Sequence, residues 1–146
     1  MYDAVIIGGG PAGYTCAIRI AQLGGKVVIV ERAQLGGDCT NYGCIPTKAL
    51  HASAGVVDYV RHAQRYGIKV DNFSVDYPLI VQRKNRVVKT SILGIRKLLE
   101  SYGVEIKQAT AQILSKNKVQ ADHEVLETKN IVIATGAQAR LLPGVM

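Results

Sequence analysis

Residues 3–32 read DAVIIGGGPAGYTCAIRIAQLGGKVVIVER and place a glycine-rich turn between two apolar runs. Residues 4–7 are uniformly apolar, which is typical of a parallel strand that is buried on both faces. Pro11 suits the first turn of a helix, and the Gly24–Gly25 pair predicts where that helix ends. Residues 26–31 predict a second parallel strand. This strand, helix, strand order indicates an α/β fold built on a parallel sheet.

The glycine-rich turn has the spacing G-x-G-x-x-G, with Gly8, Gly10 and Gly13 at the three positions. The first glycine permits the tight turn, the second lets a pyrophosphate approach the backbone, and the third lets the helix pack closely on the strand. The helix N-terminus adds N–H donors and a favourable dipole for phosphate. Glu31 follows at the end of the second strand, where a carboxylate can accept both hydroxyls of an adenosine ribose and disfavours a 2′-phosphate. Together these residues predict a Rossmann-like dinucleotide site.

The remainder of the chain continues the α/β pattern. Apolar residues at helical spacing predict helices over about 46–65 and 79–102. Residues 104–130 alternate between apolar and polar, which predicts a short antiparallel β-meander. The apolar run at 130–137 predicts a return to the buried parallel type of strand. Because no repeat, linker or low-complexity tract interrupts the pattern, we expect residues 1–146 to form one unit.

Composition excludes several classes of protein. Apolar residues make up 48% and charged residues 20%, which is ordinary for a globular domain. No apolar run approaches the roughly 20 residues of a membrane helix, and no basic leader opens the sequence. The net charge of +7 is spread out, apart from RKNRVVK at residues 83–89, which fits a solvated helix face. We therefore expect a cytoplasmic location, with neither nucleic acid nor membrane as a partner.

Two cysteines stand close together in GGDCTNYGCIPTKAL, residues 36–50. Cys39 and Cys44 could form a structural disulfide, a metal site or a redox-active pair. Three cysteines cannot supply a four-thiolate zinc site, and the three histidines complete no known ligand spacing, so we expect no metal. In a reducing compartment a close pair is more often catalytic or redox-sensing. Cys44 also precedes the helix predicted from Pro46, where the helix dipole and Lys48 favour a thiolate.

The cysteine segment resembles the redox-active disulfide segment of the class I pyridine nucleotide–disulfide oxidoreductases. That family includes dihydrolipoamide dehydrogenase, glutathione reductase and mercuric reductase. VIIGGGPAGYTCA at residues 5–17 resembles their FAD loop, and NIVIATGAQARLLPGV at residues 130–145 resembles the strand that closes the first half of their FAD domain. The resemblance covers essentially all 146 residues, in order. It implies FAD as the cofactor, with NAD bound by the parent enzyme through a separate domain.

The resemblance also implies a role for individual residues. Cys39 is expected to be the interchange thiol that meets a disulfide substrate, and Cys44 the flavin-facing thiol that makes a charge-transfer contact. Lys48 is expected near the reactive edge of the flavin, and Glu31 at the adenosine ribose. Further FAD contacts are expected from Gly8, Gly10, Ala12, Gly13, Gly37, Asp38, Ala111, Ala134, Thr135 and Gly136. Asp38 stands where many members of the family have threonine, so this contact departs from their pattern.

The Ile-Pro-Thr-Lys ending of the cysteine segment is most similar to that of dihydrolipoamide dehydrogenases, and Gly-Asp-Cys resembles some mercuric-reductase-like sequences. The resemblance therefore implies a small disulfide substrate such as lipoamide, with NADH, FAD and the Cys39–Cys44 disulfide exchanging electrons in a homodimeric parent enzyme. The chain carries no second G-x-G-x-x-G and stops at LLPGVM. We therefore expect residues 1–146 to be a FAD-binding half-domain without nicotinamide and dimerisation domains, and inactive in nicotinamide turnover.

Three hypotheses remain open on the sequence. The chain could be the FAD and disulfide portion of a dihydrolipoamide-dehydrogenase-like enzyme. It could be a truncated or designed module that binds FAD or an adenine nucleotide without catalytic turnover. It could also be a structural fragment that binds neither. The glycine loop, Glu31 and the cysteine pair are compatible with all three hypotheses and do not separate them.

Overall fold

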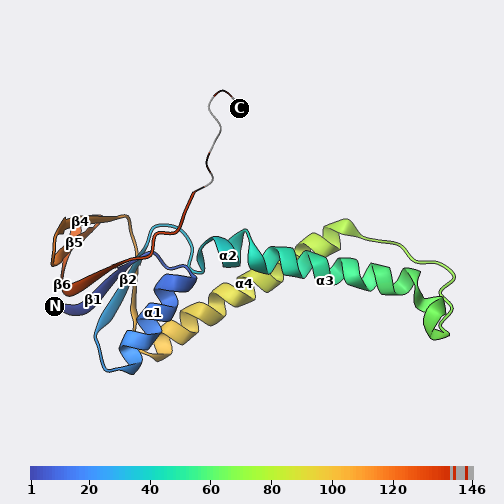
Figure 1. The fold of residues 1–146 in the computed structure, drawn as a ribbon, viewed down its shortest axis with the longest axis horizontal. Coiled ribbons are helices and arrows are strands. Elements are labelled where there is room, and N and C mark those ends of the chain that lie inside the picture. Colours follow the sequence, from blue (N-terminus) through green and yellow to red (C-terminus); the bar gives the residue numbers. More distant parts are fainter. Residues whose placement is uncertain (139, 141–143, 145–146) are drawn as a thin grey trace.

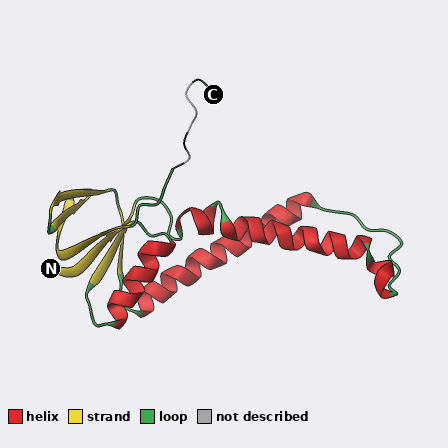
Figure 2. Cartoon of the chain, viewed as in Figure 1, coloured by secondary structure: helices red, strands yellow, loops and turns green. Residues whose placement is uncertain are grey.

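The computed structural model describes residues 1–138, 140 and 144, and it contains one mixed sheet flanked by helices (Figure 2). The strand order is β3-β2-β1-β6-β5-β4. In this order the first four strands, β3, β2, β1 and β6, pair in parallel. The pairs β6–β5 and β5–β4 are antiparallel. The bounds are β1 Tyr2–Ile7, β2 Val27–Glu31, β3 Glu105–Gln108, β4 Ala111–Ser115, β5 Lys118–Ala121 and β6 Glu124–Ile133. The predicted α/β fold with a parallel sheet and an antiparallel meander is confirmed.

The prediction that residues 104–130 form only a meander is wrong for β3. This strand pairs in parallel with β2, with Ile106 opposite Ile29, and forms one edge of the sheet. Alternation in a sequence indicates a strand but does not say which strand it pairs with, so β3 was grouped with its neighbours along the chain. The meander consists of β4, β5 and the first half of β6. Residues 139, 141–143 and 145 of the predicted return segment lie outside the described residues.

A single long strand, β6, joins the two parts of the sheet. Its first half pairs antiparallel with β5, placing Leu126 opposite Val119. Its second half pairs parallel with β1, placing Ile131 opposite Val5. The predicted meander strand and the predicted return strand are therefore one continuous element. This continuity fixes the meander relative to the end of β1, where the glycine loop begins.

Two cores lie on opposite faces of the sheet. On one face, α1 (Pro11–Gln22) and the sheet-proximal end of α4 (Tyr77–Ser101) cover β1 and β2 (Figure 1). Ile6, Ile29 and Leu99 are fully buried there. On the other face the fully buried residues are Val5, Val28, Val30 and Val119. Burial on both faces explains why residues 4–7 of β1 and 27–30 of β2 are all apolar.

The rest of the helical part is a long antiparallel hairpin. Helix α3 (Cys44–Arg61) runs away from the sheet, the short helix η1 (Ala63–Tyr66) follows, and α4 returns beside α3 (Figure 1). Arg83 of α4 donates from Nη1 to the Ala49 carbonyl of α3 at 3.0 Å and so ties the two helices. None of the helices in the described part of the chain is both long enough and apolar enough to cross a membrane.

Candidate functional site

The candidate site lies where three parallel strands end together. Gly8 follows β1, Arg32 follows β2 and Ala134 follows β6, and all three line one pocket of about 390 Å³. Open parallel sheets bind ligands outside the carboxyl ends of their strands. The topology of the sheet therefore brings together segments that are far apart along the chain.

Most of the residues that the family resemblance implies are gathered in this pocket. Those that line it are Gly8, Gly10, Ala12, Glu31, Gly37, Asp38, Cys39, Ala134, Thr135 and Gly136. Other lining residues were not predicted from the sequence, namely Pro11, Arg32, Ala33, Gln34, Asn41, Tyr42 and Ala137. Each of these lies within three residues of a predicted one along the chain. Asn41 and Tyr42 lie between the two cysteines, which was the one signal that could have identified them.

The glycine loop has the tight geometry that its motif predicts. Gly8 has φ +107°, and a Cβ placed on it would overlap the Ala134 carbonyl oxygen. A Cβ on Gly13 would overlap the Gly8 carbonyl oxygen, so α1 can approach β1 only with glycine there. Gly10 is the N-cap of α1 and makes no side-chain cap. The N–H groups of the first helical turn therefore remain for a ligand at the pocket.

Glu31 joins the glycine loop to the end of β2. Its Oε2 accepts a hydrogen bond from the Gly9 N–H at 2.7 Å, and its Oε1 accepts one from the Ala33 N–H at 2.8 Å. Each carboxylate oxygen can accept a second hydrogen bond. The carboxylate is thus held in a fixed orientation while it retains capacity to bind hydroxyl groups.

The segment with the two cysteines folds as two helices that meet at the disulfide. Cys39 lies in the short helix α2 (Gly37–Asn41), and Cys44 is the first residue of α3. The two residues form a disulfide with a Cα–Cα distance of 4.6 Å. The predicted position of Cys44 at a helix N-terminus is confirmed. Helix α2 was not predicted, and it is held near the glycine loop by a hydrogen bond from the Gly36 N–H to the Gly9 carbonyl at 2.8 Å.

Four of the implied residues do not line the main pocket. Gly13 is buried behind the glycine loop, and Cys44 and Lys48 are exposed at the start of α3. Ala111 lines a smaller pocket of about 170 Å³ that shares Gly8, Glu31 and Thr135 with the main one. The division of roles between Cys39 and Cys44 stays a prediction, since only Cys39 lines the pocket.

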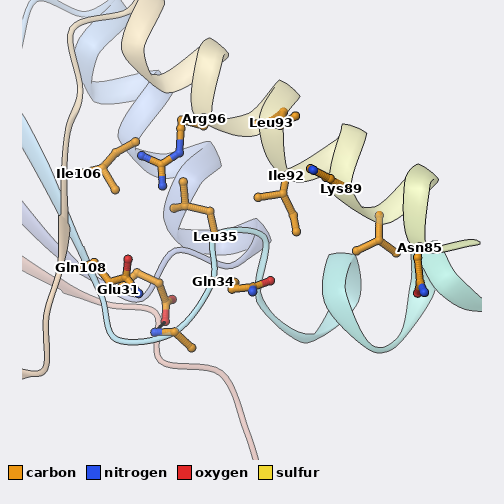
Figure 3. Close-up of a pocket in the computed structure, with 12 residues that line it drawn as sticks. Glu31, Gln34, Leu35, Asn85, Lys89, Ile92, Leu93, Arg96, Ile106 and Gln108 are labelled. Atoms are coloured by element: carbon orange, nitrogen blue, oxygen red, sulfur yellow. Dashed lines mark hydrogen bonds between the residues drawn. The ribbon is translucent and has the colours of Figure 1, made fainter. Parts of the chain in front are cut away.

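A second, larger pocket of about 520 Å³ lies between α4 and the segment after β2 (Figure 3). Ile92 and Arg96 project from α4 toward the segment that carries Gln34 and Leu35 (Figure 3). Glu31 lines this pocket too, whereas the glycine loop and Cys39 line the pocket at the strand ends. The pocket at the strand ends is therefore the candidate site, because both the glycine loop and a disulfide cysteine line it.

The largest pKa shifts belong to a cluster of side chains that do not line this pocket. Burial, and then the hydrogen bond that the Tyr2 hydroxyl donates to Glu105, raise the pKa of Tyr2 to about 12. The same hydrogen bond, followed by that from Lys107, lowers the pKa of Glu105. The Lys107 ammonium donates to Glu124 at 2.8 Å and lies 2.9 Å from Glu105, and these two carboxylates raise its pKa. This cluster links β1, β3 and β6, so its role is to join strands.

Comparisons with known proteins agree with the geometry of the site. The dihydrolipoyl dehydrogenase of Chlamydia muridarum (strain MoPn / Nigg) is 42% identical over 99% of this chain, which covers 32% of that protein. The dihydrolipoyl dehydrogenase of Acholeplasma laidlawii is also 42% identical, and the chain covers 44% of it. The chain thus spans less than half the length of either relative.

A solved structure shows the same fold. The Cu(II) complex of the HOCl-induced flavoprotein disulfide reductase RclA from Escherichia coli superposes with a TM-score of 0.74 at 31% identity. The match covers 96% of this chain and 29% of that one. The family model described as pyridine nucleotide-disulphide oxidoreductase matches residues 2–146. With the glycine loop, the acid and the disulfide in place, the chain belongs to the pyridine nucleotide-disulphide oxidoreductase family.

Proposed function

We propose that this chain is the FAD-binding and redox-active-disulfide portion of a flavoprotein disulfide oxidoreductase of the dihydrolipoyl dehydrogenase type. The observation that carries the proposal is one pocket lined by the glycine loop, by Glu31 and by Cys39 of the disulfide. A dinucleotide held there lies within the same pocket as a sulfur that can exchange electrons. Residues 1–146 act as one FAD-binding half-domain in this proposal.

The residues present fit FAD on the observations that the pocket offers. The turn at Gly8 and the close approach of Gly13 leave the N-terminus of α1 open to a pyrophosphate. Glu31 is oriented by two backbone N–H groups and can accept the hydroxyls of an adenosine ribose. FAD, when bound, supplies a two-electron acceptor and donor.

The disulfide provides the exchange chemistry. A thiolate of a dithiol substrate attacks the Cys39 sulfur, a mixed disulfide forms, and the Cys39–Cys44 bond breaks with Cys44 leaving as a thiolate. The second substrate thiolate then attacks the mixed disulfide and releases Cys39, so the substrate leaves oxidised and the chain holds two reduced cysteines. The leaving thiolate is stabilised because Cys44 is the first residue of the 18-residue helix α3. Lys48, in the next turn, adds a positive charge.

The rest of the proposal concerns the parent enzyme. Its curated relatives are named dihydrolipoyl dehydrogenase, which supports lipoamide as the disulfide substrate and NAD as the final electron partner. We place the nicotinamide site and the homodimer contacts in the part of such an enzyme that this chain does not span. A reducing compartment such as the cytoplasm suits a disulfide that must be opened in each cycle.

A binding and reduction experiment on the purified chain tests the proposal. The oxidised chain is incubated with FAD, freed of excess by gel filtration and examined by visible absorption, and its thiols are then counted before and after anaerobic dihydrolipoamide. We expect retained flavin and two additional thiols per chain, assigned to Cys39 and Cys44 by alkylation and peptide mapping.

Cys16 supplies the matched control, because it is the one cysteine in the described residues outside the disulfide. Cys16→Ser should keep both the retained flavin and the two dithiol-dependent thiols. Cys39→Ser and Cys44→Ser should each keep the flavin but lose the dithiol-dependent thiols. Retained flavin with no reducible pair would favour a binding module without turnover. A colourless chain that ignores added FAD would sink the proposal.

A further inference from the structure

The pocket between α4 and the segment after β2, called here the α4 pocket, has no role in the proposed function (Figure 3). Its volume of about 520 Å³ lies within the range of about 300–1,000 Å³ that is usual for small-molecule sites. Ala33 and Gln34 line both this pocket and the one at the strand ends, so they form a wall between the two. A ligand of the α4 pocket would therefore bind beside the FAD site and outside it.

The floor of the α4 pocket is an edge of the hydrophobic core. Leu35 is buried within the core on the α1 side of the sheet, and Ile92 and Ile106 are partly buried against that core. All three line the pocket, and Leu93 adds an exposed apolar side chain from α4. A hydrocarbon group placed on this floor would remove apolar surface from water, which favours binding. The floor therefore suits the apolar part of a ligand.

The rim of the α4 pocket is basic. Lys89 and Arg96 line it from one face of α4, because a separation of seven residues is about two helical turns. Both residues are exposed, and neither forms an ion pair with any other described residue. Helix α4 as a whole carries six basic residues and one acidic residue. A rim of this charge attracts an anionic group.

Glu31 is the one acidic residue that lines the α4 pocket in the described part of the chain. Its two carboxylate oxygens already accept hydrogen bonds from the backbone N–H groups of Gly9 and Ala33. The remaining polar groups of the lining are the neutral amides of Gln34, Asn85 and Gln108. Two cations against one hydrogen-bonded carboxylate leave the pocket positive, so it favours an anion over a cation.

We propose that the α4 pocket is a second ligand site, which binds a small carboxylate that carries an apolar chain. The Arg96 guanidinium pairs with the carboxylate through its fork of N–H donors, and Lys89 adds positive charge. The apolar chain lies on Leu35, Ile92 and Ile106. This site stands on its own lining residues and does not depend on the proposed FAD site. A cleft that was only apolar would take a neutral chain equally well, and a patch that was only basic would ignore the length of the chain.

Nuclear magnetic resonance of the ¹⁵N-labelled chain tests the site, with octanoate as the probe. We expect saturable shifts at the backbone amides of Leu35, Ile92 and Ile106. The affinity should rise from hexanoate to octanoate, by up to about fourfold for each CH₂ group that is buried. Neutral 1-octanol should bind more weakly than octanoate. Added FAD should not displace octanoate, whether or not FAD itself binds, so a failure of the proposed FAD function would leave this result unchanged.

Substitutions on α4 separate the two parts of the site. Arg96→Gln should weaken octanoate binding by about three- to tenfold and leave 1-octanol binding unchanged. Lys97→Gln is the matched control, because it removes the adjacent charge, which does not line the pocket, and it should change the affinity less than about twofold. Leu93→Ser should weaken both probes. Leu98→Ser should weaken neither, because Leu98 is equally exposed on α4, at 46% against 47%, and lies outside the pocket.

Three results would overturn the proposal. The first is an equal loss of octanoate affinity in Arg96→Gln and Lys97→Gln, which would indicate a general effect of charge. The second is binding of 1-octanol as tight as that of octanoate, which would leave an apolar cleft that does not recognise an anion. The third is the absence of saturable shifts at the pocket, including shifts confined to the exposed apolar residues between α3 and α4, such as Tyr66 and Phe73.

Discussion

The Glu31 carboxylate accepts a hydrogen bond from the Gly9 N–H at 2.7 Å, so the acid expected at the ribose also anchors the glycine loop. A second hydrogen bond, from the Ala33 N–H at 2.8 Å, holds the other oxygen. One side chain therefore couples the stability of the loop to its ability to bind a nucleotide. Stability and affinity should fall together when this carboxylate is changed.

Glu31→Gln tests that coupling. The amide can accept from one backbone N–H but presents its own NH₂ to the other, which should destabilise the chain by about 1–2 kcal/mol. Chemical denaturation measures this loss, and calorimetric titration should show weaker ADP binding. Glu127→Gln is the control, since its pairing with Lys118 at 3.4 Å is exposed and should contribute less than about 1 kcal/mol. Equal effects of the two substitutions would contradict the anchoring role.

Gly13→Ala tests the close packing of α1 on β1. Its Cβ would overlap the Gly8 carbonyl oxygen, so we expect a loss of about 1–3 kcal/mol in the free energy of unfolding. Gly94→Ala is the matched control within α4, because a Cβ there meets open space. It should stabilise the chain by about 1 kcal/mol through helix propensity. Thermal unfolding of both variants gives the comparison, and a neutral Gly13→Ala would show that α1 can move away from the loop.

Asp76→Ala tests the start of the long helix α4. The Asp76 side chain accepts from the Leu79 N–H at 2.9 Å and is the N-cap. Its removal should cost about 1 kcal/mol in thermal unfolding. Asp71→Ala, in the exposed connector before the cap, should have little effect. A loss that is the same for both would indicate a general charge effect in place of a cap.

The parts of the fold that were predictable from the sequence depend on local signals. The glycine spacing, Pro11 and two apolar runs specify β1, α1 and β2, because these elements follow one another and pack on one another. The partner of β3 was not predictable, since parallel pairing with β2 joins residues separated by the whole helical hairpin. Its alternation indicates a strand and carries no information on its partner.

The same contrast holds within the candidate site. The motifs predicted most of the lining residues because each motif is a short segment at a strand end. Helix α2 was missed because it is only five residues long and is held by a tertiary hydrogen bond from Gly36 to Gly9. Asn41 was missed for the same reason, since the backbone carbonyls that orient its amide are brought together only by α2.

Tyr2 gives the fold a dependence on alkaline pH. Burial and the hydrogen bond to Glu105 raise the pKa of Tyr2 from 10.0 to about 12. A folded-state pKa above the unfolded one means that the folded chain holds its proton longer, so this contribution to stability is complete below about pH 10 and is lost as the pH rises toward 12. Tyr2→Phe should remove a tyrosine ionisation near pH 12 from an ultraviolet difference titration, and should flatten the stability curve between pH 10 and 12.

Glu105 makes the stability contributed by the Tyr2–Glu105 hydrogen bond fall in acid as well. The hydrogen bond from Tyr2, and then that from Lys107, lower the pKa of Glu105, so its contribution is present above the unfolded pKa of about 4.5 and is lost as the pH falls through the lowered value. The stability difference between wild type and Tyr2→Phe should therefore be largest near neutral pH and shrink at both extremes. Tyr66→Phe, at an exposed tyrosine in η1, is the control and should follow the wild type throughout. A difference that stays constant from acid to alkaline pH would mean that the hydroxyl acts through packing, without the ionised Glu105 as its partner.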